Sequence, residues 1–356
     1  MERLLKIDME QLNYYVGNNL IVKNKHPEHD IWILNYSPKA TYHKQWNEYT
    51  LACRGLVIDG NGNIIARPFE KFFNMEELTE DQIPYGMEFD VFDKVDGSLG
   101  ILFCYNNNWI LASRGSFISD QAIMGWNMLN KDYLKILNKK YTYLFEIIYP
   151  ENRIVVDYGG KKELVLLGAI QTDIGLEMLH EDLVGYYAEY FTIVKKYEFN
   201  GEIKDLKNLF EENREGFVVR FLNGFRMKVK FEEYIRLHRI ITNVSNKTVW
   251  EHLKNKYDFE ELIDRVPDEF YDWVKRTISG LTEEYEKVEY AALKEFYQIY
   301  HNSGCIDRKL FAEKAKESEY RSILFNMYTG KDYDDIIWDM VRPDYAKPFK
   351  DGYVTD

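Results

Sequence analysis

The sequence contains few cysteines and no long apolar run, and each absence excludes a class of protein. Its three cysteines, Cys53, Cys104 and Cys305, form no CxxC pair and are odd in number, which argues against a disulfide framework or a structural zinc site. The longest uninterrupted apolar stretch covers residues 164–170 and is far too short to cross a bilayer. The amino-terminal residues mix charges and lack the apolar core of a signal peptide. We therefore expect a cytoplasmic protein, in the host cytoplasm if its source is viral, with no membrane partner.

Positive charge is also scarce, since the formal net charge is −13. Taken alone, this balance argues against a nucleic-acid partner, because phosphate binding requires a basic face. The segment 215–240 is an exception, because its six lysines and arginines outnumber its three glutamates. A basic strip inside an acidic protein is the pattern expected of a local phosphate site.

The chain shows no internal repeat, and its 356 residues suit about two domains. Up to about residue 240, short alternating strands dominate. Asn223-Gly224 between two such strands predicts a tight hairpin, and Asn106–Asn108 predicts another. After Tyr234, apolar residues recur every three or four positions, which predicts helices. We therefore predict an α+β protein, with a mixed α/β domain built on antiparallel sheets at 1–242 and an all-α domain at 243–356.

Lys94 is the first candidate for chemistry. It stands in Asp93-Lys94-Val95-Asp96-Gly97, directly after a predicted strand. A lysine beside a glycine that admits a ligand close to the backbone can act as a nucleophile, provided that burial or neighbouring positive charge lowers its pKa. The pattern K-x-D-G is short, however, and also occurs in ordinary charged loops.

Lys228 and Lys230 form a second candidate feature, followed by Tyr234. Alternation along a strand places both lysines on one face, where they repel each other unless an anion lies between them. They could bind a nucleotide phosphate and also depress the pKa of Lys94. The alternative is a solvated strand face.

Two isolated carboxylates suggest a metal site. Glu146 lies within an apolar run, and Glu215 begins a predicted strand. A carboxylate in an apolar strand is costly unless it is paired or binds a metal ion, and Mg²⁺ beside phosphates typically takes one or two carboxylates. The alternatives are a core arginine as partner for Glu146 and a turn or edge position for Glu215. Upstream, Arg54 and Lys71 could reach triphosphate oxygens, although alone they would indicate only a surface hairpin.

Seven segments, taken in chain order, closely resemble the covalent nucleotidyltransferase superfamily, and within it the RNA ligase 1 family, whose type member is the bacteriophage T4 enzyme. The segments are C-R-G-L-V-I-D at 53–59, R-P-F-E-K-F-F-N at 67–74, D-K-V-D-G-S-L at 93–99, S-R-G-S-F at 113–117, F-E-I-I-Y-P-E-N-R-I-V at 145–155, E-G-F-V-V at 215–219 and M-K-V-K-F-E-E-Y at 227–234. One such motif is weak, but seven in register are highly specific. The resemblance covers about half of the chain, from about residue 54 to residue 238.

The resemblance implies a role for each matched residue. Lys94 would be the catalytic nucleophile that carries AMP, and Lys228 and Lys230 would hold the α-phosphate. Glu146 would bind the ribose or help to place a metal ion, and Glu215 would support a catalytic metal ion. The residues expected to bind the nucleotide are Arg54, Lys71, Asp93, Lys94, Gly97, Arg114, Glu146, Glu215, Lys228, Lys230 and Tyr234.

Four of these residues need a further word: Arg54, Lys71, Tyr234 and Arg114. Arg54 and Lys71 would contact AMP or the pyrophosphate leaving group. Tyr234 matches a tyrosine that follows the final motif. Arg114 stands where the type member has lysine; both are cations, but their geometry and hydration differ.

The function implied by the resemblance is ATP-dependent RNA ligation. The enzyme would join 5′-phosphate and 3′-hydroxyl RNA ends through lysyl-AMP and adenylylated RNA, using ATP and Mg²⁺ or Mn²⁺, in RNA or tRNA repair. Residues 1–242 would be the adenylyltransferase domain, and the helical domain at 243–356 would serve RNA specificity, with nicked tRNA as one candidate substrate. We expect a monomer.

Two alternative functions remain open from the sequence. A DNA ligase or an mRNA-capping enzyme would typically add an OB-type β-barrel after the final motif, where this chain reads as helical. A non-catalytic RNA-binding homologue would bind RNA without transferring AMP.

Overall fold

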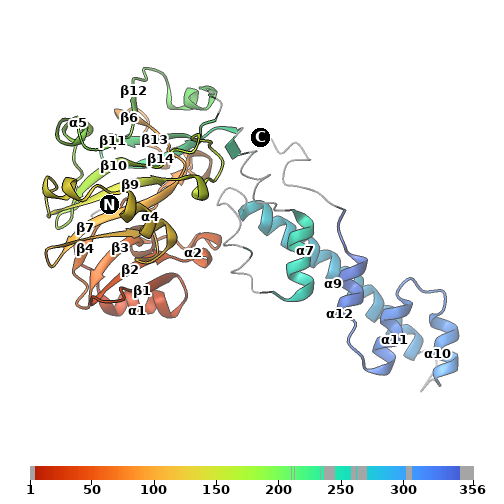
Figure 1. Ribbon diagram of the computed structural model, residues 1–356. Helices are drawn as coiled ribbons and strands as arrows, with labels where there is room; N and C mark the ends of the chain where they lie inside the picture. Colours follow the sequence, from red (N-terminus) through yellow and green to blue (C-terminus); the bar gives the residue numbers. More distant parts are fainter. Residues whose placement is uncertain are drawn as a thin grey trace. The chain divides into compact units, whose positions relative to one another are not determined.

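The computed structural model describes residues 5–209, 211, 213–232, 234–235, 245–257, 262, 271–301 and 307–344 (Figure 1). The chain divides into two compact units, Met1–Ile241 and Thr242–Asp356. Among the described residues, the strands lie in the first unit and the second unit is helical. The mixed α/β character and the largely antiparallel sheets confirm the predicted class, with two short parallel pairings, β10 with β11 and β14 with β5, as additions.

The first sheet has the order β1-β2-β3-β4 and carries the amino-terminal helices. Its elements are α1 (Met9–Gly17), β1 (Ile21–Lys25), β2 (Ile31–Tyr36), α2 (Pro38–Tyr42), α3 (Glu48–Ala52), β3 (Arg54–Asp59) and β4 (Ile64–Ala66). Asp8 begins α1 by accepting hydrogen bonds from the N–H groups of Glu10 and Gln11, as an N-cap aspartate does. In this sheet, Tyr36 is the last residue of β2 and Arg54 is the first residue of β3.

The second sheet has the order β11-β10-β9-β7-β8 and holds the largest apolar strands. Its elements are β7 (Ser98–Tyr105), β8 (Asn108–Ser113), α4 (Asp120–Met128), β9 (Tyr141–Ile148), β10 (Glu163–Gln171), α5 (His180–Tyr187) and β11 (Thr192–Ile193). The predicted hairpin between β7 and β8 is confirmed, and Asn106 and Asn107 at its tip have positive φ values of 49° and 66°. Burial of Tyr143, Phe145 and Ile147 on the central strand β9 anchors the sheet.

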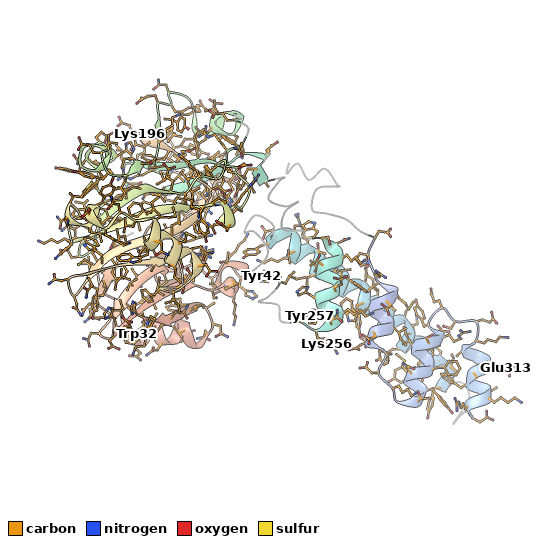
Figure 2. All side chains as sticks on the ribbon, viewed as in Figure 1. Trp32, Tyr42, Lys196, Lys256, Tyr257 and Glu313 are labelled. Atoms are coloured by element: carbon orange, nitrogen blue, oxygen red, sulfur yellow. The ribbon has the colours of Figure 1, made fainter. Side chains whose placement is uncertain are left out.

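The third sheet has the order β12-β6-β13-β14-β5. Its strands are β5 (Phe73–Asn74), β6 (Phe89–Asp93), β12 (Lys196–Tyr197), β13 (Gly216–Phe221) and β14 (Arg226–Lys230). The predicted Asn223-Gly224 hairpin joins β13 to β14, and Gly224 takes the positive φ of 84° that this turn needs. At the edge, Lys196 pairs with Asp90 of β6 at 2.7 Å and Glu181 of α5 at 2.9 Å (Figure 2).

Short 3₁₀ helices connect these sheets. They are η1 (Met75–Glu77), η2 (Glu80–Gln82), η3 (Lys131–Lys135), η4 (Pro150–Asn152) and η5 (Ile203–Asn208).

The second unit is built from α7 (Asn246–Asn255), α9 (Tyr271–His301), α10 (Arg308–Ala315), α11 (Arg321–Thr329) and α12 (Asp334–Met340). The long helix of this unit is α9. Phe311 of α10 and Leu324 of α11 are fully buried. The Trp250 indole donates a hydrogen bond to the carbonyl of Trp338 at 2.7 Å, which ties α7 to α12. Lys256, after α7, pairs with Asp334 at 2.8 Å (Figure 2). Within the described residues, no helix is both long and apolar enough to span a bilayer.

Candidate active site

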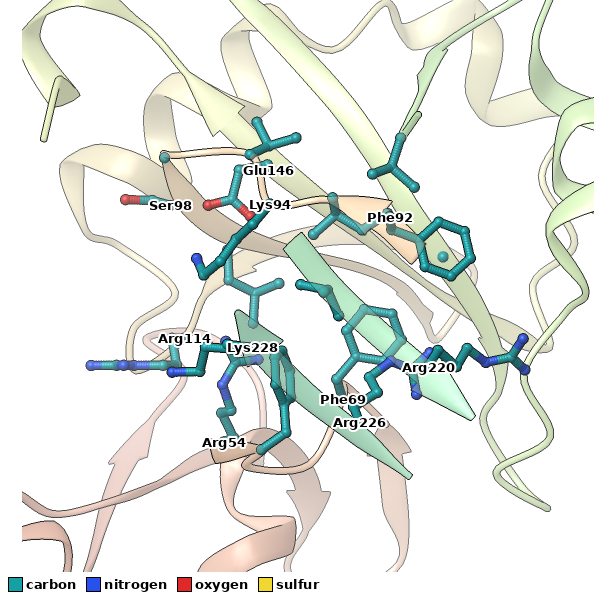
Figure 3. A pocket seen from close by; sticks show the side chains of 18 of the residues that line it. Arg54, Phe69, Phe92, Lys94, Ser98, Arg114, Glu146, Arg220, Arg226 and Lys228 are labelled. Carbon is teal, nitrogen blue, oxygen red and sulfur yellow. The ribbon is translucent and has the colours of Figure 1, made fainter. Parts of the chain in front are cut away.

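The first unit contains a pocket of about 520 Å³, a size typical of small-molecule sites. We call it the charged pocket. All three sheets contribute to its lining, which includes Arg54, Phe69, Phe72, Phe92, Asp93, Lys94, Gly97, Ser98, Arg114, Glu146, Glu177, His180, Arg220, Arg226 and Lys228. Figure 3 shows Arg54, Arg114 and Lys228 gathered on one side near Lys94, with Arg220 and Arg226 on the other side near Phe69.

Lys94 lies directly after β6, at the edge of the charged pocket. Its backbone N–H donates to the carbonyl of Gly216 at 3.0 Å, which fixes the strand end against β13. Its ammonium lies 2.7 Å from Glu215 Oε2, and Lys230 Nζ lies 3.2 Å from Glu215 Oε1. One buried carboxylate therefore joins two of the lysines that the sequence singled out.

The charge of Glu215 is stabilised by these two partners. Burial by itself would raise the pKa of Glu215, but the ammonium groups of Lys94 and Lys230 outweigh it and hold the pKa below its usual range. Gly216 follows with φ of 144°, and a Cβ there would lie 2.1 Å from the carbonyl oxygen of Val229. A glycine is therefore required for β13 to approach β14 at this point.

Glu146 projects from β9 into the same pocket beside Lys94 (Figure 3). Loss of hydration raises the pKa of Glu146 to about 8; Lys94 acts against this rise and the neighbouring charge of Glu215 adds to it. A carboxyl in a pocket whose pKa is strongly perturbed is a candidate functional group. Gly97 makes the close approach possible, since a Cβ there would lie 2.7 Å from the carbonyl oxygen of Ile147.

Arg54 and Arg114 enter the pocket from β3 and from the loop after β8. Burial lowers the pKa of Arg54, the charge of Arg114 adds to this effect, and a hydrogen bond with Tyr36 opposes it. The guanidinium carbon of Arg114 lies 5.7 Å from the centre of the Tyr36 ring. Two cations near one aromatic ring in a pocket form a site for an anionic group.

Lys71 lies elsewhere, since it does not line the charged pocket. Its ammonium is enclosed by three rings, at 5.3 Å from Tyr36 and 5.4 Å from both Trp46 and Phe73. It lines a second pocket of about 320 Å³ that shares Phe69, Phe72 and Arg226 with the first. Tyr36 thus adjoins Arg54, Arg114 and Lys71. Sequence reasoning missed this tyrosine because four residues far apart in the chain meet there.

Tyr234 acts on the loop that carries Lys94. Its hydroxyl donates to Asp96 Oδ1 at 2.9 Å, while Asp96 Oδ2 accepts the N–H groups of Val155 and Val156, each at 2.9 Å. Asp96 is 4% exposed, so this aspartate of the K-x-D-G motif fastens the loop to neighbouring segments. Tyr234 is not among the residues that line the charged pocket, and the structure links it to the Lys94 loop through Asp96.

The basic strip at 215–240 is largely compensated by carboxylates of the same unit, one of them, Glu215, within the strip itself. Arg226 pairs with Glu177, Arg220 Nε lies 3.5 Å from the same carboxylate, and Lys230 pairs with Glu215. Lys228 lines the charged pocket. Residues 236–240 of the strip lie outside the described residues. Glu177 gave no signal in the sequence because its arginine partners lie more than 40 residues away along the chain.

The sequence model of the RNA ligase family of the T4 type matches residues 52–235, about half of the chain. Apart from Asn35, the residues that line the charged pocket lie in this segment. The chain belongs to the T4 RNA ligase 1-like family. The resemblance described above is thereby confirmed.

The relatives differ in how much of their own length the chain covers. An RNA ligase of Rhodothermus phage RM378 is 24% identical, with 76% of each chain covered. A candidate bifunctional polynucleotide kinase/RNA ligase of Autographa californica nuclear polyhedrosis virus is 26% identical over 64% of this chain, which spans only 36% of that protein. The solved structure of a candidate ATP-dependent DNA ligase from Aquifex aeolicus is 16% identical in sequence, with a TM-score of 0.46. The match covers 91% of this chain and 100% of that one.

Proposed function

We propose that this chain is an ATP-dependent RNA ligase that holds AMP on Lys94. The observation that carries the proposal is the cluster at the edge of the charged pocket. Lys94 lines the pocket, and Glu215 and Lys230, which are not among its lining residues, lie behind it: Glu215 bridges Lys94 and Lys230 at 2.7 Å and 3.2 Å. Glu146, Arg54, Arg114 and Lys228 line the same pocket. Family membership supports the same reading.

The reaction consists of three displacements at phosphorus. The deprotonated Lys94 amine attacks the α-phosphate of ATP, the bond to the bridging oxygen breaks, and pyrophosphate leaves. A 5′-phosphate oxygen of RNA then displaces the lysine and takes the AMP through a new phosphoanhydride bond. Finally a 3′-hydroxyl, losing its proton, attacks the activated phosphate, forms the phosphodiester and releases AMP.

Each of these steps concentrates negative charge on phosphate oxygens. The cations in and beside the pocket are therefore suited to them. Lys228 and Lys230 would hold the α-phosphate, and Arg54 and Arg114 would receive the pyrophosphate end. Lys71 would act near that end from its position against Tyr36. Tyr234 would act through Asp96 by keeping the Lys94 loop in place.

A divalent cation, Mg²⁺ or Mn²⁺, fits the carboxylates present. No group of three potential ligands that could hold a metal by themselves occurs among the described side chains. Glu146 and Glu215 are close enough to affect each other electrostatically, and Glu146 has lost much of its hydration. Mg²⁺ beside phosphates needs only one or two carboxylates, and it would supply charge neutralisation at the α-phosphate.

The finer points of the proposal concern the substrate and the two units. Residues 1–242 would form the adenylyltransferase domain, and residues 243–356 would serve RNA specificity, with nicked tRNA bearing 5′-phosphate and 3′-hydroxyl ends as a candidate. The protein would act as a monomer of 42.6 kDa, which light scattering can measure.

The proposal is tested by incubating the protein with ATP labelled at the α-phosphate, and then with 5′-phosphorylated single-stranded RNA or DNA in parallel. We expect a labelled protein, transfer of label to RNA, and sealed RNA. Lys94→Ala should abolish labelling, whereas Lys135→Ala, which removes a lysine whose side chain is 79% exposed, should not. Labelling that persists in Lys94→Ala, or sealing of DNA alone, would refute the proposal.

A further inference from the structure

Two ion pairs lie side by side where the end of β6 meets the start of β13. In one pair the β6 side supplies the anion, and in the other it supplies the cation. Arg214 NH2 lies 2.5 Å from Asp93 Oδ1, and Lys94 Nζ lies 2.7 Å from Glu215 Oε2. Each strand end thus contributes one cation and one anion, in adjacent positions. No local sequence pattern singles out Arg214.

Arg214 is firmly held in this position. Its side chain is 15% exposed, and NH1 lies 2.6 Å from Glu211. Its guanidinium carbon lies 4.8 Å from the ring centre of Tyr197 and 5.3 Å from that of Phe217. A planar guanidinium can bridge two carboxylates and stack on rings at once, which the compact ammonium of a lysine cannot reproduce.

Asp93 is the negatively charged partner of Arg214. Its carboxylate lines the charged pocket, is 28% exposed and adjoins the residue proposed as the nucleophile. Released from Arg214, it would compete with Glu215 for the ammonium of Lys94. It would also place negative charge beside the phosphates of the incoming nucleotide.

We infer that Arg214 is a positioning residue that holds the Asp93 carboxylate away from Lys94 and from the nucleotide phosphates. This inference rests on the proposed function, because it assumes that Lys94 receives AMP from ATP. Arg214 is not among the residues that line the charged pocket, whereas its partner Asp93 is, so its effect would pass through Asp93. Its effect is to leave Glu215 as the carboxylate that orients Lys94.

The test measures the single-turnover rate of protein labelling by ATP over a range of ATP concentrations. Arg214→Met should raise the ATP concentration for half-maximal rate by about tenfold or more, since it leaves a partly buried charge without its partner. Arg214→Lys should recover part of the loss. Lys207→Met, which breaks the half-exposed pair with Glu76, serves as the matched control and should behave as the wild type.

The double variant Asp93→Asn/Arg214→Met separates this role from a structural one. If Arg214 acts by controlling the charge of Asp93, the double variant should label at least fivefold faster than Arg214→Met at low ATP, because the exposed negative charge is gone. A double variant that folds but stays as slow as Arg214→Met overturns the inference. So does a double variant that fails to fold, because Arg214 would then act through its other contacts.

Labelling of the wild-type protein by ATP distinguishes a failure of the proposed function from a failure of the role proposed for Arg214. If the wild type forms no labelled adduct, the proposed function fails. If it labels and Arg214→Met labels equally well at every ATP concentration, only the role of Arg214 fails.

Discussion

Replacing Glu146 by glutamine should stabilise the ligand-free protein while abolishing the proposed ligase activity. The folded structure raises the pKa of Glu146 from 4.5 to about 8 through burial, so the protein favours the neutral carboxyl. Glutamine keeps the shape and the neutral state, but cannot supply the negative charge that a metal ion or ribose contact would use. Stability and function are therefore expected to change in opposite directions.

The size and sign of the effect follow from the two pKa values. A group whose pKa is raised on folding favours the folded state below its unfolded pKa, and that contribution is lost as the pH rises through the folded pKa. Here the window runs from pH 4.5 to about 8. Since one pH unit corresponds to about 1.4 kcal/mol, and partial hydration of the pocket reduces the effect, ionisation of Glu146 should cost about 3–5 kcal/mol at the upper end.

The assay is urea denaturation of the wild type and Glu146→Gln from pH 4.5 to 9, without nucleotide or divalent metal. The variant should gain on the wild type as the pH rises, with the gain levelling off above about pH 8. Glu198→Gln, at an exposed position, is the control and should show no such gain. A difference between Glu146→Gln and the wild type that is flat with pH, or that favours the wild type, would refute the reasoning.

Two further predictions concern the groups around Lys94. Glu215→Gln leaves two ammonium groups without their shared anion, so it should lower the free energy of unfolding at pH 7 by about 3 kcal/mol and stop AMP transfer; an unchanged urea midpoint would contradict this. The same pair implies that the wild type loses stability as the pH falls through the depressed pKa of Glu215, a loss that Glu215→Gln should lack. Tyr234→Phe removes the donor to the buried Asp96 and should cost about 1–3 kcal/mol by thermal denaturation, with slower labelling; wild-type values in both would show that this bond does not hold the loop.

Much of the fold could be predicted from local patterns. The Asn223-Gly224 hairpin and the hairpin at Asn106 depend only on residues next to one another, because each turn must adopt positive φ. The shared face of Lys228 and Lys230 is also confirmed, since Met227 and Val229, which alternate with them along the strand, are buried on the opposite face. Period-two and period-3.6 patterns carry such information within a single element.

The pairing of distant strands carried no such local signal. β6 lies between β12 and β13, more than 100 residues away in the chain, and nothing in its alternation reveals those partners. The meeting of Lys94 and Glu215 was expected only from the resemblance to the family. Arg214 escaped notice because its role depends on Asp93, with which it has no pattern in common.

Lys71 shows that the order of motifs along the chain does not reveal what surrounds a side chain in the folded protein. The resemblance implies that Lys71 contacts AMP or pyrophosphate, and this role stays a prediction. The structure surrounds its ammonium with the rings of Tyr36, Trp46 and Phe73, and Lys71 does not line the charged pocket. Those rings come from separate segments, and their convergence depends on tertiary packing. The position of a cation in the sequence therefore did not reveal its surroundings.

The central claim is that the Lys94 amine forms the covalent bond to AMP. The most direct measurement is peptide mapping by mass spectrometry after incubation with ATP and Mg²⁺ in the absence of RNA. We expect a single adenylylated peptide with the modification on Lys94, which disappears when pyrophosphate or 5′-phosphorylated RNA is added. AMP found on Lys228 or Lys230 instead, or a protein that never carries AMP, would contradict the account.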